Sequence, residues 1–207
     1  MTPHHRELFD DIGQLVVTIR YDPSVPNSQF RQGEVLSGLL ELRFDAALLS
    51  EESFLDSSTA PAERLTHPWT IILSPDCDLQ WDFAARQGEA NIEAKCLSHV
   101  LLCDLEELAA LQAGRIPKTS RDKDLITQNR NERFHFLPSS ETQGGSQTHP
   151  DYFVDFKRVF SEHIDYLYAV TEKEFVMRCG FLKSPWVQHL ADRFTYFLGR
   201  VGLPDSE

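Results

Sequence analysis

The sequence predicts a mainly β fold with helices, in which a small, strongly bent barrel is covered by one amphipathic helix. The apolar runs are short and end at turn residues, which is typical of strands rather than helices. Only the C-terminal region shows a long repeat of apolar residues at three- and four-residue steps. The 207 residues, of which 41% are hydrophobic, suffice for one core. We therefore expect a single domain over residues 1–207.

Six short apolar runs are predicted to be strands. They are rich in β-branched and aromatic residues and comprise residues 15–19, 35–42, 69–73, 100–103, 134–137 and 153–160. Gly38, inside the second run, indicates a bulge or a tight bend. After the fourth run, the apolar spacing of residues 105–111 before Gly114 predicts a short helix. Closing such strands into a barrel removes the sheet edges that favour aggregation.

The best-specified element is a helix near the C-terminus. Ser184 is a suitable N-cap residue, and Pro185 is tolerated in the first helical turn. Apolar side chains then recur on one face until Gly202 and Pro204 end the helix. This face is predicted to pack on the barrel.

Two polar stretches interrupt the predicted strands, at about residues 45–66 and 115–150. The segments on either side are too short to form cores of their own. These stretches are therefore predicted to be insertions within one domain rather than linkers between domains.

Composition argues against several classes of protein. The chain has 20 Lys+Arg against 32 Asp+Glu, a net charge of -12, and so repels a polyanion unless its basic groups gather on one face. Its four cysteines lack the C-x-x-C spacing of a zinc site and the density of a disulfide scaffold. There is no long apolar span and no signal-peptide pattern. We expect a cytoplasmic protein without a membrane partner.

One segment places two carboxylates and a thiol directly after a predicted strand. Asp76, Cys77 and Asp78 could hold a divalent cation, or Cys77 could act as a nucleophile with a base such as His67, His99 or His135. Adjacent carboxylates would raise the pKa of the thiol and weaken it as a nucleophile. The alternative is a turn in which aspartate caps backbone amides and Cys77 packs inward.

A metal-dependent nuclease pattern overlaps this segment. Asp76 is followed by Glu93 and Lys95 in the spacing in which acids hold magnesium and a lysine polarises water; the metal ligands would be Asp76, Asp78 and Glu93. Pro-Asp occurs three times in the chain, so such a match arises easily by chance.

The remaining histidines and arginines carry weaker signals. The eight histidines form no H-x-x-x-H or H-E-x-x-H pattern, so we expect no helical zinc site and predict no cofactor. His135 should point opposite to Phe134 and Phe136 on one strand and face solvent. Arg133 belongs to a basic cluster diluted by acidic residues, which favours a solvated loop.

Several segments resemble the MazF/PemK family of growth-inhibitor toxins. Gly33-Glu34-Val35-Leu36 is similar to the family's opening glycine-acid-apolar strand, and the run from His67 to Pro75 is similar to its second strand. Residues 100–104, 154–160 and 179–203 resemble, in turn, its apolar strand, its Asp-x-x-Arg strand, and its Gly-x-Leu turn with the final helix.

The resemblance implies an SH3-like barrel and the activity of a metal-independent endoribonuclease that works as a homodimer and is neutralised by an antitoxin. His67 stands where the family has a strand-opening arginine, and Asp104 stands where it has a threonine. Asp155 and Arg158 match the family pattern. The resemblance covers roughly a third of the chain and consists of small and apolar residues, which indicate fold more than activity.

These observations lead to one functional prediction and its alternatives. We predict a toxin-like or defence-associated endoribonuclease acting on single-stranded RNA, with His67 as acid or base, Arg158 as phosphate contact and Asp155 orienting both. The residues expected to bind substrate or support the catalytic groups are Cys77, Asp78, Asp104, Arg133 and His135. The alternatives are the metal-dependent nuclease and a non-catalytic barrel that binds a partner protein.

Overall fold

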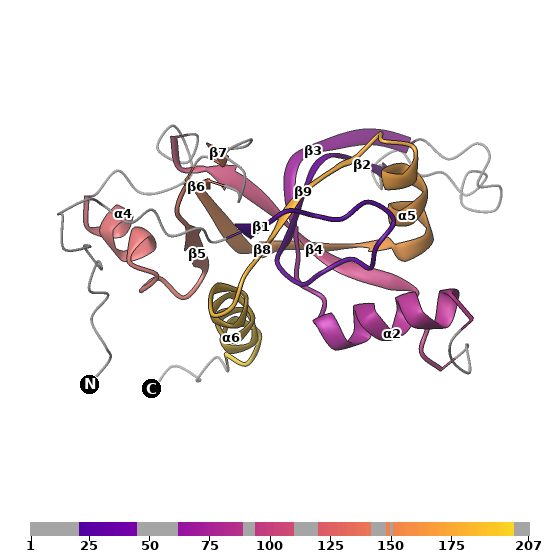
Figure 1. Ribbon diagram of the computed structural model, residues 1–207. Helices are drawn as coiled ribbons and strands as arrows, with labels where there is room; N and C mark the ends of the chain where they lie inside the picture. Colours follow the sequence, from indigo (N-terminus) through magenta and orange to yellow (C-terminus); the bar gives the residue numbers. More distant parts are fainter. Residues whose placement is uncertain are drawn as a thin grey trace, which may run out of the picture.

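The computed structural model describes residues 21–44, 62–88, 94–109, 120–141, 148–149 and 151–200 (Figure 1). The strands are β1 (Tyr21–Asp22), β2 (Glu34–Phe44), β3 (Ala62–Ile72), β4 (His99–Glu107), β5 (Phe134–Leu137), β6 (Ser140–Glu141), β7 (Thr148–His149), β8 (Tyr152–His163) and β9 (Met177–Leu182). The helices are α2 (Asp76–Arg86), α4 (Ser120–Thr127), α5 (Ile164–Glu172) and α6 (Trp186–Leu198). The predicted mainly β class with helices is confirmed.

Seven strands form one antiparallel sheet in the order β1-β9-β2-β3-β4-β8-β5, and β6 and β7 form a separate pair. Within the described residues, the end strands β1 and β5 each pair with a single neighbour, so the sheet is not closed. The predicted SH3-like barrel is therefore not confirmed.

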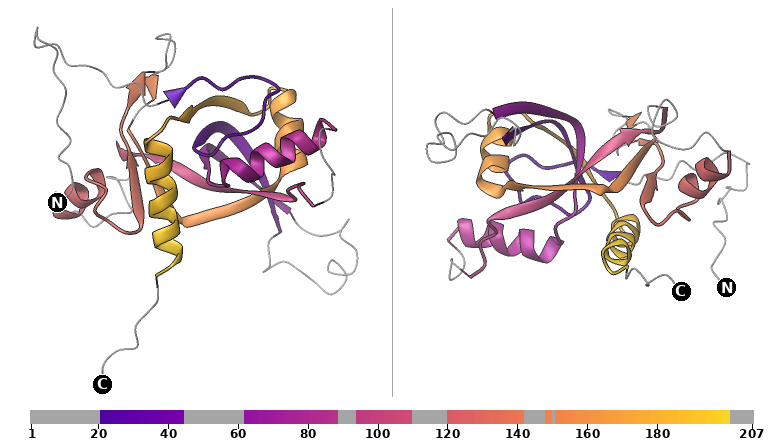
Figure 2. Two further views of the ribbon diagram at one scale, coloured as in Figure 1. Left: turned by 60° about the horizontal axis from the view of Figure 1, so that its bottom comes forward. Right: turned by 180° about the vertical axis from the view of Figure 1, so that it is seen from behind.

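The two faces of the sheet carry separate cores. Successive strand residues point to opposite faces; accordingly Val35 and Ile71 belong to one core, and Leu36 and Ile72 to the other. The first core is covered by α6, and the second by α2 and α5 (Figures 1 and 2). Leu39 returns to the core of Leu36, three residues before it, because Gly38 adopts a φ of 83° that turns the strand. This is the bend that the sequence predicts.

The predicted helix over residues 105–111 is wrong at its start. β4 continues to Glu107, and Leu105 lies opposite Val154 of β8 inside the first core. Pairing with β8 satisfies the backbone groups of this segment and buries Leu105, which outweighs a local helical pattern. Residues 108–109 are helical, and residues 110–114 lie outside the described residues.

The two predicted insertions differ from the structure in their bounds and in their content. Residues 62–66 belong to β3 and pair with β2, with Thr66 opposite Leu40, so the first insertion extends too far. The second contains α4 and β5. The predicted strand at 15–19 lies outside the described residues, as do most of the first insertion and the end of the C-terminal helix prediction at Gly202 and Pro204.

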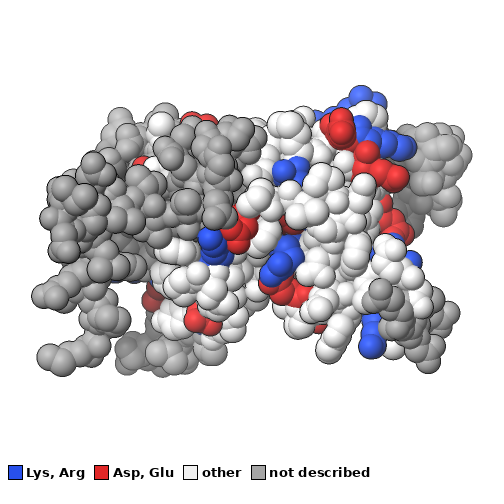
Figure 3. Space-filling model, viewed as in Figure 1, with Lys and Arg blue, Asp and Glu red and all other residues white. Residues whose placement is uncertain are grey.

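The C-terminal helix starts after Pro185, the N-cap residue, rather than after Ser184, and ends at Leu198 before Gly199. None of the described helices has the length and apolar character needed to cross a membrane. On the face shown in Figure 3, basic and acidic side chains of the described residues are interspersed and form no extended basic area.

Candidate functional site

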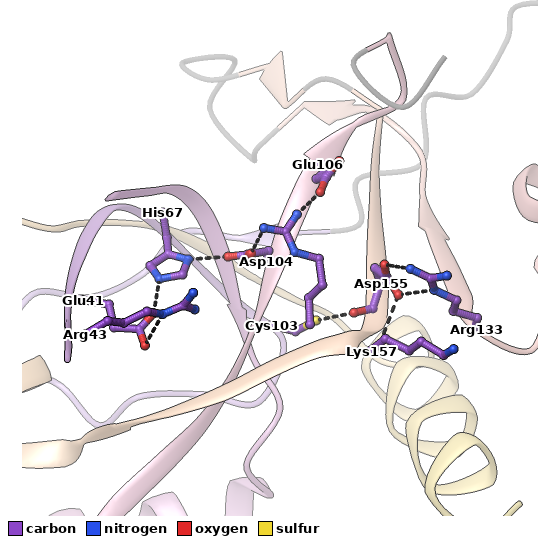
Figure 4. Close-up of polar contacts among 10 residues, drawn as sticks. Glu41, Arg43, His67, Cys103, Asp104, Glu106, Arg133, Asp155 and Lys157 are labelled. Carbon is purple, nitrogen blue, oxygen red and sulfur yellow. Dashed lines mark hydrogen bonds and ion pairs between the residues drawn. The ribbon is translucent and has the colours of Figure 1, made fainter. Parts of the chain in front are cut away.

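The most closely connected polar side chains lie on neighbouring strands and centre on His67 of β3. As Figure 4 shows, its Nδ1 lies 2.5 Å from Oδ1 of Asp104 on β4, and its Nε2 lies 2.8 Å from Oε2 of Glu41 on β2. The imidazole is 2% exposed and stacks on Phe160, with 4.3 Å between the ring centroids. Both ring nitrogens of His67 are therefore engaged by carboxylates.

Two arginines extend this arrangement. Nη2 of Arg158, on β8, lies 2.6 Å from Oδ2 of Asp104, and its Nη1 pairs with the carboxylate of Glu106. Nε of Arg43 lies 2.8 Å from Oε1 of Glu41. Each carboxylate thus has a cationic partner. We call this set the His67 network; it comprises Glu41, Arg43, His67, Asp104, Glu106 and Arg158.

The charge state of His67 follows from its neighbours. Burial lowers the pKa of His67, but the hydrogen bonds with Asp104 and Glu41 outweigh burial, so the pKa is raised above its ordinary value of 6.5. An imidazolium with both N–H groups donating to carboxylates is held in place and has no nitrogen left for a substrate. The network therefore favours a stable charged cluster over an acid or base in contact with solvent.

Asp155 does not join the His67 network. Its carboxylate accepts hydrogen bonds from Nε of Arg133 at 2.7 Å and from Nη2 at 2.5 Å. Asp155 lies opposite Phe134 of β5, which places it beside Arg133 and away from His67 (Figure 4). Asp155 and Arg158 both lie in an irregular stretch of β8, between Val154 and Val159, where the pairing with β4 is interrupted. The structure thus joins His67 and Arg158 through Asp104 and separates both from Asp155.

The Asp76-Cys77-Asp78 segment forms the first turn of α2. Asp76 accepts hydrogen bonds from the side chain of Arg31, at 3.1 Å, and from the backbone N–H of Gln32, at 2.7 Å. Cys77 is exposed, and its Sγ lies 3.6 Å from Oδ1 of Asp78. Cys77 therefore does not pack inward.

The described residues around Asp76 and Asp78 form no candidate metal centre. Asp76 is occupied by its arginine partner, and no group of three or more potential metal-ligating side chains occurs in the described part of the chain. Lys95 lies 5.7 Å from the ring centroid of Trp81, and Glu93 lies outside the described residues.

His135 is buried, which corrects the prediction that it faces solvent. It is 2% exposed, because α6 covers this side of β5 and places the ring of His189 at 5.1 Å between centroids. Burial, with His189 and Arg193 nearby, lowers the pKa of His135 well below its ordinary value. Its Nδ1 has no hydrogen-bond partner among the described residues. His135 is therefore neutral and remote from solvent.

A further cavity among the described residues lies elsewhere, and sequence reasoning missed it. It has a volume of about 900 Å³ and is lined by the segment 24–28, the C-terminal ends of α2 and α5, residues 174 and 176, and residues 177–179 of β9. We call it the β9 groove. No local signal in the sequence indicates it, because its walls come from segments that are far apart in the chain.

Arg86, Tyr168 and Arg178 line the β9 groove, and the buried ring of Phe30 lies between Tyr168 and Arg178. The guanidinium of Arg86 lies 5.4 Å from the ring centroid of Tyr168, Tyr168 lies 4.8 Å from Phe30, and Phe30 lies 4.6 Å from the guanidinium of Arg178. The hydroxyl of Tyr168 is buried and has no hydrogen-bond partner among the described residues.

Comparisons of the chain with protein-family models, with curated proteins and with solved structures find no match. The resemblance to the MazF/PemK toxins therefore stays a prediction. The function has to be argued from the geometry of the two sites.

Proposed function

We propose that this chain is a non-catalytic module that binds a partner protein in the β9 groove. The observation that carries the proposal is the groove itself, whose volume of about 900 Å³ is that of a binding site. Val25, Phe175 and Met177, in or beside the segments that line it, are 59%, 73% and 57% exposed. Exposed large apolar side chains in and beside the lining of a groove favour a site of protein contact.

The His67 network supports the non-catalytic part of the proposal. General acid or base catalysis needs a nitrogen within hydrogen-bond reach of the substrate, and both nitrogens of His67 are engaged by carboxylates. Arg158 is likewise paired with two carboxylates, Asp104 and Glu106, which neutralise it as a phosphate contact. The network is thus better suited to holding four strands together than to cleaving RNA.

Site-specific photocrosslinking tests the proposal. A benzophenone amino acid is placed at Asn27, which lines the groove, and in a control protein at Leu198, which is 64% exposed on α6. In cells that normally produce the protein, we expect a partner to be attached at Asn27 and not at Leu198. Met177→Asp should abolish this product without changing the urea unfolding midpoint by more than a surface substitution does. Equal products at both positions, or none at Asn27, overturn the proposal.

A second candidate is the metal-independent endoribonuclease with the MazF/PemK-type fold. The observation in its favour is that His67 and Arg158 both contact Asp104. Its substrate would be single-stranded RNA, and its partners would be an antitoxin-like protein and a second copy of the chain. Incubation with structured and unstructured RNA, with and without EDTA, separates the candidates. Cleavage that survives EDTA and is lost in His67→Ala supports the ribonuclease; the binding module predicts no cleavage in any sample.

A further inference from the structure

One edge of β9 is open along the groove. β1 pairs with β9 only at Phe181 and Leu182, and β2 occupies the other side of the strand. At residues 177–180, no described strand pairs with β9 on the β1 side. An open strand edge carries N–H and C=O groups that can pair with another extended chain.

The β9 groove follows this edge. Side chains of successive strand residues point to opposite faces of a sheet. Nevertheless, the consecutive residues Met177, Arg178 and Cys179 all line the groove. The alternation is interrupted at Cys179, an extra residue of β9 between the pairs Val35–Gly180 and Leu36–Arg178, so the groove reaches all three residues. The opposite wall is the segment 24–28. This segment follows β1, whose pairing with β9 ends at Asp22.

Among the described residues that line the groove, the basic side chains are paired with carboxylates, whereas two acidic side chains are unpaired. Arg86 is bound by the buried carboxylate of Asp82, at 2.8 Å, and Arg178 by that of Glu34, at 2.7 Å, so both cations are neutralised. Glu172 and Glu174 also line the groove and are exposed. Neither glutamate has an ion-pair partner within the residues that the structure describes.

We propose that the partner contributes an extended basic segment that adds as a strand to the open edge of β9. Its backbone pairs with residues 177–179, as in other cases of recognition by strand addition. Its lysine or arginine side chains contact Glu172 and Glu174, and its apolar side chains contact Met177 and Phe175. This inference rests on the proposed function and names the class of partner that the groove accepts.

Fluorescence anisotropy with defined peptides tests the inference. The probes are labelled ten-residue peptides in which valine alternates with lysine, the same peptides with glutamate in place of lysine, and the lysine peptides with N-methyl groups on alternate amides. We expect the lysine peptides to bind at least about tenfold more tightly than the glutamate peptides at low salt. N-methylation should weaken binding by at least about tenfold, because it removes the donors needed for strand pairing.

Charge reversal in the protein provides the matched variants. Glu172→Lys/Glu174→Lys should invert the preference between the lysine and glutamate peptides. Asp124→Lys/Glu132→Lys makes the same change of net charge at exposed residues outside the β9 groove and should leave the preference unchanged. Urea unfolding of both variants shows whether each is folded.

The outcomes separate this inference from the proposed function. Equal binding of the N-methylated peptides overturns strand addition, and equal binding of the glutamate peptides overturns the basic partner. If no lysine peptide binds at about 100 μM while crosslinking at Asn27 still captures a partner, the inference is overturned and the proposed function stands. If crosslinking at Asn27 also fails, both are overturned.

Discussion

Replacement of His67 by alanine removes the two hydrogen bonds at the centre of the His67 network. Each joins a buried imidazolium to a carboxylate, and such bonds contribute about 1.5 kcal/mol each. Both carboxylates keep an arginine, Arg158 or Arg43, so no buried charge is left unpaired. We expect the free energy of unfolding to fall by about 3 kcal/mol, and the melting temperature to fall by roughly 6–12 °C.

The loss should depend on pH with a definite sign. Because the pKa of His67 is raised in the folded protein, its stabilisation is complete below the unfolded pKa of about 6.5 and is lost as the pH rises through the folded pKa. Urea unfolding monitored by tryptophan fluorescence should therefore show a larger difference between wild type and His67→Ala at about pH 6 than at about pH 9.

A control variant and the refuting results complete this experiment. His99→Ala, at an exposed histidine of β4, should change the free energy of unfolding by less than about 0.5 kcal/mol. A loss below about 1 kcal/mol for His67→Ala at about pH 6 would refute the charged network, and so would a loss that grows as the pH rises.

Three further results are expected. Arg178→Ala leaves the fully buried carboxylate of Glu34 without its guanidinium partner and should lower the free energy of unfolding in urea by roughly 3–5 kcal/mol. The double variant Arg178→Met/Glu34→Gln removes both charges and should lower it by less. A larger loss in the double variant would contradict the ion pair. Gly180→Ala should cost roughly 3 kcal/mol, because its φ is 135° and the new Cβ would lie 2.8 Å from a backbone oxygen of β1. Gly88 has a φ of 80°, and no atom lies within 4 Å of a Cβ added there, so Gly88→Ala should cost only about 1 kcal/mol. Equal thermal destabilisation by the two glycine substitutions would exclude the close contact at Gly180. A thiol reagent should label the two exposed cysteines in the native protein and the two buried cysteines, whose pKa values are raised by burial, only after unfolding; four fast thiols would contradict this burial.

The positions of most regular elements could be predicted because their signals are local. The runs 35–42, 100–103 and 134–137 lie within strands, since short apolar runs bounded by turn residues fit a pleated sheet. Residues 105–107 could not be assigned correctly, because their pairing partner in β8 is distant in sequence. His135 was misplaced for a similar reason, since α6 covers the side of β5 that alternation alone assigns to solvent.

The candidate sites were predictable only in part. Asp104, Arg158 and His67 are singled out by the sequence, but their connection through Asp104 depends on the pairing of β3 with β4 and of β4 with β8. Asp155 was grouped with them because it matches the Asp-x-x-Arg pattern of the resemblance, yet the pairing of β8 with β4 is interrupted between Val154 and Val159, and Asp155 lies opposite Phe134 of β5, beside Arg133. Sequence spacing does not contain this interruption of the pairing.

The sequence by itself determined the mainly β class, the bend at Gly38 and the amphipathic C-terminal helix, because each depends on side-chain periodicity or backbone freedom within a few residues. Only the tertiary structure decided that both nitrogens of His67 are engaged and that a groove opens beside β9. Both features depend on which strands pair and where that pairing stops. Contacts of this kind join residues far apart in the chain, and their free energies do not follow from any local pattern.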